Sequence, residues 1–116
     1  QILSFGPALV LEGLVSVTEE EEVGRAKASN PRTAIGQCAD GSVLLLVLDG
    51  RSINTLGATM QDVADIMLEY GAVNAGNLDG GSSSVMVYDG EIINNCASVT
   101  GPRNIPTAFI VLPEGD

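Results

Sequence analysis

Short apolar runs, separated by glycine and acidic residues, organise the first third of the chain. Residues 9–11 and 14–17 are apolar apart from Ser16, and Glu12-Gly13 lies between them. This spacing predicts one bent strand or two short strands. Residues 18–31 are polar and include the run Glu19-Glu20-Glu21-Glu22. We expect this segment to be an exposed connection, with the acidic run solvated rather than bound to a metal or a partner.

A clear hairpin signal follows. Residues 33–38 and Val43–Leu48 are strand candidates on either side of Asp40-Gly41. Aspartate followed by glycine tolerates positive φ, so this dipeptide is typical of a hairpin turn. Because Val43–Leu48 is apolar at every position, it is expected to be buried on both faces.

One segment has helical spacing. Thr59 is a suitable N-cap for a helix at about residues 59–70, and Asp62 stands where a capping-box partner is found. Gly71 occupies the position of a left-handed C-cap. Apolar residues recur at i, i+3, i+4 and i+7 and predict the buried face of the helix: Val63, Ile66, Met67 and Tyr70.

The remainder of the chain returns to strand patterns. Strands are expected at residues 72–77, 84–88, 91–93 and 105–112, with Asp89-Gly90 as a second hairpin turn. Residues 94–104 are polar and are expected to form a loop. The order predicts an α+β fold with a mixed, mostly antiparallel sheet, one main helix and several hairpins, in a single domain over residues 1–116.

Composition narrows the classes of function. The 116 residues are 45% hydrophobic, and the net charge is −10 with only five basic residues. This balance argues against a nucleic-acid footprint and against binding to anionic membranes. No apolar stretch is long enough to insert into a bilayer. The chain lacks histidine, so a Ser-His-Asp triad is excluded, and we expect neither a metal nor another cofactor. Cys38 and Cys96 can form a disulfide or remain thiols, and the sequence does not decide between them.

The most chemically dense segment is the loop Asn77-Leu78-Asp79-Gly80-Gly81-Ser82-Ser83-Ser84. Its paired glycines allow backbone N–H groups to approach a ligand, and its hydroxyls can donate to phosphate or sugar oxygens. The same residue types also make a tight turn in which Asp and Ser satisfy their own backbone. From composition alone the two interpretations are equally good.

Arginines lie near the ends of several predicted strands. Arg32 opens a strand, Arg51 follows Asp49-Gly50 at the end of another, and Arg103 precedes the last strand. Each of them alone is more often a surface residue. A guanidinium can, however, donate hydrogen bonds to two phosphate oxygens at once. Asp49 is interpreted as either a turn residue or a site carboxylate, whereas Asp40 is expected to be a turn residue.

These motifs together resemble a known family. Asn30-Pro31-Arg32-Thr33-Ala34-Ile35-Gly36 with Leu46-Val47-Leu48-Asp49-Gly50-Arg51 is similar to the first signature of the phosphodiester glycosidase domain family. The loop at residues 77–83 is similar to its second signature. Gly57-Ala58-Thr59 and Gly71-Ala72 match the segment between, and Pro102-Arg103 matches the third. Members include N-acetylglucosamine-1-phosphodiester alpha-N-acetylglucosaminidase, known as the uncovering enzyme, and exopolysaccharide-related bacterial proteins.

The resemblance runs from about residue 5 to residue 112 and implies a glycosidase that cleaves sugar-1-phosphate diesters. The family also carries a signature upstream of Asn30 that this sequence does not show, so we expect the chain to be the C-terminal part of a larger domain. The resemblance implies that the catalytic residues are Asp79 and Asp49. The residues that the resemblance implies for binding of substrate and phosphate are Arg32, Thr33, Arg51, Asn77, Gly80, Gly81, Ser82, Ser83 and Arg103.

Two other classes of function are consistent with the sequence. One is a non-catalytic module that binds carbohydrate or phosphate, and the other is an inactive structural fragment of a larger assembly. The expected partner is a carbohydrate phosphodiester, and an exposed sheet edge could also pair between copies as a homo-oligomer. We expect the chain to be located outside the cell or in the cell envelope.

Overall fold

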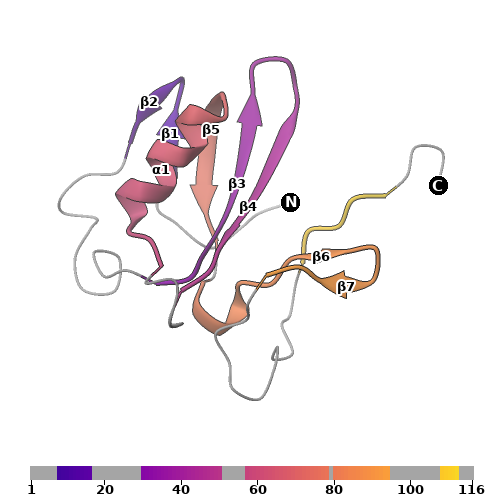
Figure 1. The fold of residues 1–116 in the computed structure, drawn as a ribbon. Helices are drawn as coiled ribbons and strands as arrows, with labels where there is room; N and C mark the ends of the chain where they lie inside the picture. Colours follow the sequence, from indigo (N-terminus) through magenta and orange to yellow (C-terminus); the bar gives the residue numbers. More distant parts are fainter. Residues whose placement is uncertain (1–7, 17–29, 51–56, 79, 95–107, 113–116) are drawn as a thin grey trace.

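The computed structural model describes residues 8–16, 30–50, 57–78, 80–94 and 108–112. Five strands form one sheet in the order β2-β1-β5-β3-β4, and two more form a separate hairpin. Every pair of neighbouring strands within these sheets is antiparallel. Among the described residues, a single α-helix covers one face of the larger sheet (Figure 1). The α+β fold with a mostly antiparallel sheet, predicted from the sequence, is therefore confirmed.

The first hairpin joins β1 (Ala8–Leu11) to β2 (Leu14–Val15). Glu12 and Gly13 both have positive φ, at 51° and 80°, and make the turn between them. The backbone N–H of Gly13 donates to the carbonyl of Val73 at 2.9 Å. The apolar runs at the start of the chain thus form two short strands, and their turn is fastened to the neighbouring strand.

The second hairpin joins β3 (Arg32–Cys38) to β4 (Val43–Leu48) in a continuous register from Arg32 opposite Leu48 to Gln37 opposite Val43. Asp40 is a turn residue, as the sequence predicts. Its Oδ1 accepts from the backbone N–H of Ser42 at 2.9 Å. This hydrogen bond, with a further one from the Ser42 side chain, lowers the pKa of the exposed Asp40 carboxyl.

Strand β4 is not buried on both faces, and that prediction is wrong. Leu44, Leu46 and Leu48 pack against the core. On the other face the exposed fractions of Val43 and Leu45 are 61% and 38%. The reason is topological, because β4 is the edge strand of the sheet and the helix covers only one face. An entirely apolar strand sequence cannot distinguish an edge strand from a central one.

Helix α1 (Met60–Glu69) forms where it is predicted. The Thr59 hydroxyl accepts from the N–H of Asp62 at 3.1 Å, and the Asp62 carboxylate accepts from the N–H of Thr59 at 2.9 Å. This complete capping box stabilises the helix start by about 1 kcal/mol. The helix ends before Gly71, whose φ of 92° is left-handed. Tyr70, expected on the buried face, is 69% exposed because it lies past the last turn.

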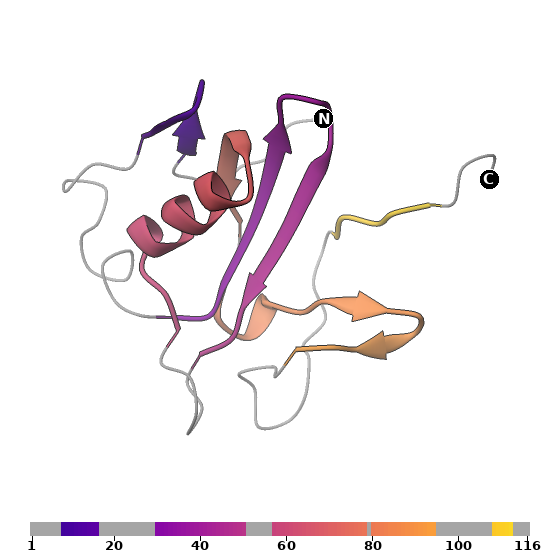
Figure 2. The same cartoon turned by 45° about the horizontal axis from the view of Figure 1, so that its top comes forward.

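The core lies between α1 and the sheet (Figure 2). Val63 and Met67 of the helix are fully buried, and each contributes roughly 1.5–3 kcal/mol through its apolar area. Ala34 of β3 and Ala75 of β5 (Ala72–Asn77) are small enough to let the helix approach the strands. The core therefore combines bulky residues on the helix and on β1 with small residues on β3 and β5.

The C-terminal part departs from the sequence-based expectations. A 3-10 turn (Gly81–Ser83) follows β5, and the strand expected at residues 84–88 is reduced to β6 (Val87–Tyr88). It pairs with β7 (Glu91–Ile92) through the predicted Asp89-Gly90 turn. Of the strand expected at residues 105–112, the described part, residues 108–112, has no strand pairing, so that prediction is wrong there. Strand propensity alone does not form a strand where no partner strand lies beside the segment.

Candidate active site at one end of the sheet

Antiparallel pairing brings the two best sequence motifs to the same end of the sheet. Strand β3 begins there, beside the ends of both β4 and β5, because Arg32 pairs with Leu48 and Ala34 pairs with Asn77. The loop at residues 80–84 follows β5 directly. Segments about 45 residues apart in the sequence are therefore neighbours at this sheet end (Figure 1).

Three glycines let these segments approach at backbone distance. A Cβ added to Gly57 would lie 2.4 Å from the carbonyl carbon of Asn30, and one on Gly80 would lie 2.6 Å from the oxygen of Pro31. A Cβ on Gly50 would lie 2.8 Å from the Cα of Gly57. Only glycine fits at such contacts. Each glycine belongs to a different motif, and together they enclose the segment that precedes β3.

The backbone of the Gly-Ser loop is largely satisfied within the protein. The N–H of Gly81 donates to the carbonyl of Pro31 at 3.0 Å, and the N–H groups of Ser83 and Ser84 donate to Gly80 and Gly81 at 3.1 Å. These three groups are therefore engaged in holding the loop. The sequence had suggested loop N–H groups as contacts for a ligand, and these three have partners within the protein.

Arg32 is buried, with 7% of its surface exposed. Its Nε donates to the carbonyl of Ala58 at 2.8 Å, and its Nη1 lies 3.9 Å from the sulfur of Met60. The guanidinium thus connects the start of β3 to the segment that begins α1. Asn77, at the end of β5, is also buried, with 6% exposed.

Thr33 and Asp49 occupy the opposite face of the sheet end. The Thr33 hydroxyl donates to the hydroxyl of Ser84 at 3.0 Å, and Ser84 is 1% exposed. Oδ1 of Asp49 accepts from the side-chain amide of Asn94 at 3.1 Å. Sequence reasoning did not single out Ser84 individually or Asn94 at all. The available signal for Asn94 was weak, namely an amide residue directly after the apolar pair Ile92-Ile93.

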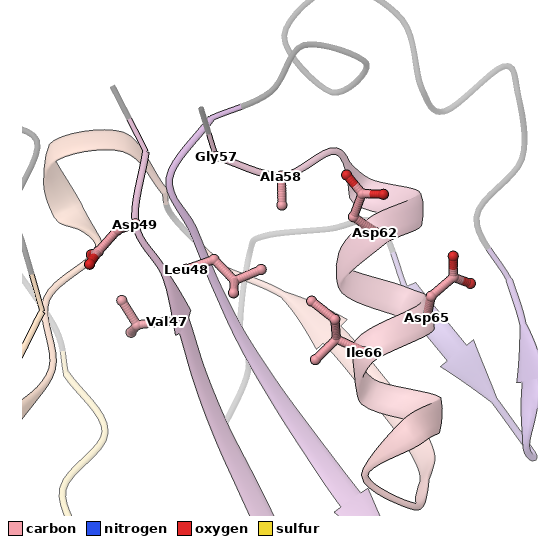
Figure 3. A pocket seen from close by; sticks show the side chains of 8 residues that line it. All are labelled: Val47, Leu48, Asp49, Gly57, Ala58, Asp62, Asp65 and Ile66. Atoms are coloured by element: carbon pink, nitrogen blue, oxygen red, sulfur yellow. The ribbon is translucent and has the colours of Figure 1, made fainter. Parts of the chain in front are cut away.

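An open cleft of about 650 Å³ lies between β4 and the first turns of α1. Leu48 and Ile66 point toward each other across its floor, and Asp62 and Asp65 extend from the helix (Figure 3). The Asp49 side chain points away from the helix at the other side of the cleft. The described lining therefore combines an apolar floor with the carboxylates of Asp62 and Asp65, and it consists of Val47, Leu48, Asp49, Gly57, Ala58, Asp62, Asp65 and Ile66.

Three sequence-predicted site residues, Asp79, Arg51 and Arg103, lie outside the described residues, as does the side chain of Ser82. Of the two cysteines, Cys38 has a free thiol and Cys96 lies outside the described residues. Within the described ranges, no group of three or more acidic, cysteine or histidine side chains is placed to hold a metal ion. No helix in those ranges is both long and apolar enough to cross a membrane.

The polar motifs of this α+β fold meet at one end of the sheet, and loops held by a rigid scaffold often carry binding and catalytic residues. The comparisons with known proteins identify the class. The family model described as phosphodiester glycosidase matches residues 1–112. The chain belongs to the phosphodiester glycosidase family.

Two curated relatives illustrate the range of the family. The chain is 33% identical, over 97% of its length, to the SPbeta prophage-derived uncharacterized protein YomE of Bacillus subtilis, of which it covers 18%. It is 38% identical, over 53% of its length, to bovine N-acetylglucosamine-1-phosphodiester alpha-N-acetylglucosaminidase, of which it covers 11%. The chain thus spans less than a fifth of the length of these relatives.

Solved structures agree with the family assignment. The chain superposes on the zebrafish N-acetylglucosamine-1-phosphodiester alpha-N-acetylglucosaminidase catalytic domain, auto-inhibited by its pro-peptide, with a TM-score of 0.68 and 26% identity. This match covers 84% of the chain and 38% of the zebrafish one. A Burkholderia pseudomallei protein described as a candidate exported protein matches with a TM-score of 0.62 and 41% identity, over 65% of this chain and 15% of that one.

Proposed function

We propose that the protein is a hydrolase that cleaves the glycosidic bond of a sugar-1-phosphate diester. The observation that carries the proposal is the meeting of Asn30-Pro31-Arg32, Asp49 and the Gly80–Ser84 loop at one sheet end in a chain of this family. The names of the bovine and zebrafish relatives support the substrate class.

In the proposed reaction, water attacks the anomeric carbon of the sugar. The bond between that carbon and the phosphate oxygen breaks, and its electron pair leaves with the phosphate as a phosphomonoester. Asp79 takes the proton of the attacking water or stabilises the developing oxocarbenium ion. A phosphate leaving group departs as a stabilised anion and needs little protonation. One carboxylate can therefore suffice, and Asp49 is the second candidate for the same role.

The phosphate requires positive charge and donors. We assign these to Arg51 and Arg103 with the hydroxyls of Ser82 and Ser83. Arg32 stays a candidate, but its buried hydrogen bond to Ala58 gives it a structural task as well. Thr33, Asn77, Gly80 and Gly81 complete the proposed binding set. Their contribution is to hold the loop and to orient the sugar or the carboxylate.

The acidic cleft beside α1 is better suited to the sugar than to the phosphate. Its described lining includes Asp62 and Asp65 of the helix, and their negative charges repel an anion. Carboxylate oxygens accept hydrogen bonds from sugar hydroxyls, and the apolar floor at Leu48 and Ile66 can contact a sugar ring. The phosphate then lies beside Asp49, on the side that faces the Gly-Ser loop.

Hydrolysis in water enriched in oxygen-18 tests the proposed bond cleavage. With a methyl diester of N-acetylglucosamine-1-phosphate as the probe, we expect the label in the sugar and none in methyl phosphate. Mass spectrometry of both products measures this. Label in the phosphate product would identify a phosphodiesterase instead. Binding without any turnover would favour a non-catalytic module, and neither result is compatible with a glycosidase.

An extracellular or envelope location is part of the proposal, supported by the Burkholderia neighbour described as a candidate exported protein. Its test is fractionation of the producing cells. Recovery of the protein in the cytoplasmic fraction alone would contradict the assigned location.

Self-association is a second proposed property. Strand β4 is an apolar edge strand with Val43 and Leu45 exposed, and such edges pair with other strands. We expect light scattering to show a dimer and Leu45→Lys to shift it to the monomer. Lys is a residue that natural sheet edges use against pairing. Val87 is exposed on the separate hairpin, so Val87→Lys is the control and should not change the molecular mass measured by light scattering. A monomeric wild-type protein rules out this property.

A further inference from the structure

One amide side chain connects three segments of the candidate site. Oδ1 of Asn94 accepts from the backbone N–H of Met86 at 2.7 Å. Its Nδ2 donates to the carbonyl of Ser84 at 2.8 Å and to Oδ1 of Asp49 at 3.1 Å. Asn94 follows β7, Ser84 ends the Gly-Ser loop, and Asp49 follows β4. Asp49 is 45 residues from Asn94 in the sequence, so only the fold brings its carboxylate to the amide and the loop end.

The contacts fix the orientation of this amide. The N–H of Met86 requires an acceptor, so the carbonyl oxygen of Asn94 must face it. The amide nitrogen then faces Ser84 and Asp49, both of which offer oxygen acceptors. The reverse orientation would oppose donor to donor at Met86 and acceptor to acceptor at the other two residues. The network thus has a single consistent arrangement.

The same network reaches β3. The buried hydroxyl of Ser84 accepts from the Thr33 hydroxyl at 3.0 Å, and the carbonyl of Thr33 accepts from the N–H of Leu78 at 2.8 Å. Asn94 thus holds the carboxylate of Asp49 beside a loop end that is itself tied to β3. A carboxylate bound at one oxygen by a rigid donor has a defined direction for its other oxygen.

We propose that Asn94 is a positioning residue of the active site, which acts by orienting the Asp49 carboxylate against the Gly-Ser loop. This inference rests on the proposed function. Orientation of reacting groups has large effects, since a displacement of about 1 Å can lower a rate by roughly 10²-fold. A residue with this role affects turnover more than substrate binding, and it acts through Asp49 rather than independently of it.

The experiment compares four full-length proteins with the N-acetylglucosamine-1-phosphate methyl diester as the probe: wild type, Asn94→Asp, Asp49→Ala and the double variant. Asn94→Asp keeps the acceptor for Met86, removes both donors and places a second carboxylate beside Asp49, so the hydrogen bond that orients Asp49 is replaced by repulsion. We expect kcat to fall by about 10- to 100-fold with KM changed by less than threefold. In the Asp49→Ala background the same substitution should lower kcat by less than threefold.

Asn74 provides the matched control, because it is an exposed asparagine whose Oδ1 accepts from the N–H of Glu12 at 3.2 Å, near the turn between β1 and β2. Asn74→Asp makes the same chemical change and should leave kcat unaltered. The melting temperature of each variant separates a loss of folding from a loss of orientation.

Each outcome has a distinct consequence. A wild-type kcat in Asn94→Asp overturns the positioning role. Equal fold-changes in the wild-type and Asp49→Ala backgrounds also overturn it, because Asn94 then acts independently of Asp49, yet they leave the glycosidase proposal intact. Absence of turnover in the wild-type protein would instead contradict the proposed function itself.

Discussion

Asp79→Asn is expected to lower kcat for a sugar-1-phosphate diester by about 10²–10⁴-fold, because the amide can neither accept a proton from water nor carry the negative charge that stabilises an oxocarbenium ion. The carboxylate and the amide have nearly the same size and shape. The melting temperature should therefore change little. Release of the free sugar, followed in a coupled assay or by mass spectrometry, measures the effect.

Asp89→Asn is the matched control for this experiment. Asp89 also precedes a glycine, but it lies in the exposed turn between β6 and β7 with a φ of 51°. Asparagine tolerates this left-handed conformation as well as aspartate does. We expect wild-type kcat and stability from it. An Asp79→Asn protein with kcat within twofold of wild type would remove Asp79 from the mechanism and leave Asp49 as the remaining candidate.

Gly57→Ala is expected to have the largest effect on stability. Gly57 has a φ of 93°, which is costly for an L-residue, and its new Cβ would lie 2.4 Å from the backbone of Asn30. Positive φ and overpacking together cost about 2–5 kcal/mol. That is a large share of the roughly 5–15 kcal/mol by which domains are stable. Urea denaturation followed by circular dichroism measures the change.

Two other glycines separate the causes of this effect. Gly13 has a φ of 80° but no atom within 4 Å of an added Cβ, so Gly13→Ala isolates the cost of the backbone conformation. Gly76 likewise has open space and no positive φ, so Gly76→Ala should be close to neutral. Gly57→Ala should destabilise more than Gly13→Ala. Equal losses from the two would mean that the contact with Asn30 relaxes without cost.

Local sequence signals predicted those elements whose stabilising contacts are also local. The helix from Met60 to Glu69 is bounded by Thr59 and Gly71, and both signals lie within a turn of the helix ends. The hairpin around Asp40-Gly41 is likewise determined by residues next to one another. Patterning and turn chemistry suffice there because each interaction spans only a few residues.

Predictions that depended on distant neighbours were less successful. Strand Val43–Leu48 was expected to be buried on both faces, yet Leu45 is partly exposed because β4 is an edge strand and the helix covers only the other face. Residues 108–112 have strand composition but no strand pairing. A strand is stabilised by hydrogen bonds to another segment, so its own sequence cannot state whether that segment is present.

For the candidate site, the sequence by itself determined which residue types were available: a dense Asp-Gly-Gly-Ser loop, a few arginines and the motifs of a phosphodiester glycosidase. Only the tertiary structure decided how the described ones are used. It directs Arg32 to Ala58, engages the N–H groups of the loop in backbone hydrogen bonds, and links Asp49 to Asn94. The physical reason is that side-chain partners depend on which strand ends are adjacent, and antiparallel pairing, not proximity in the sequence, sets that adjacency.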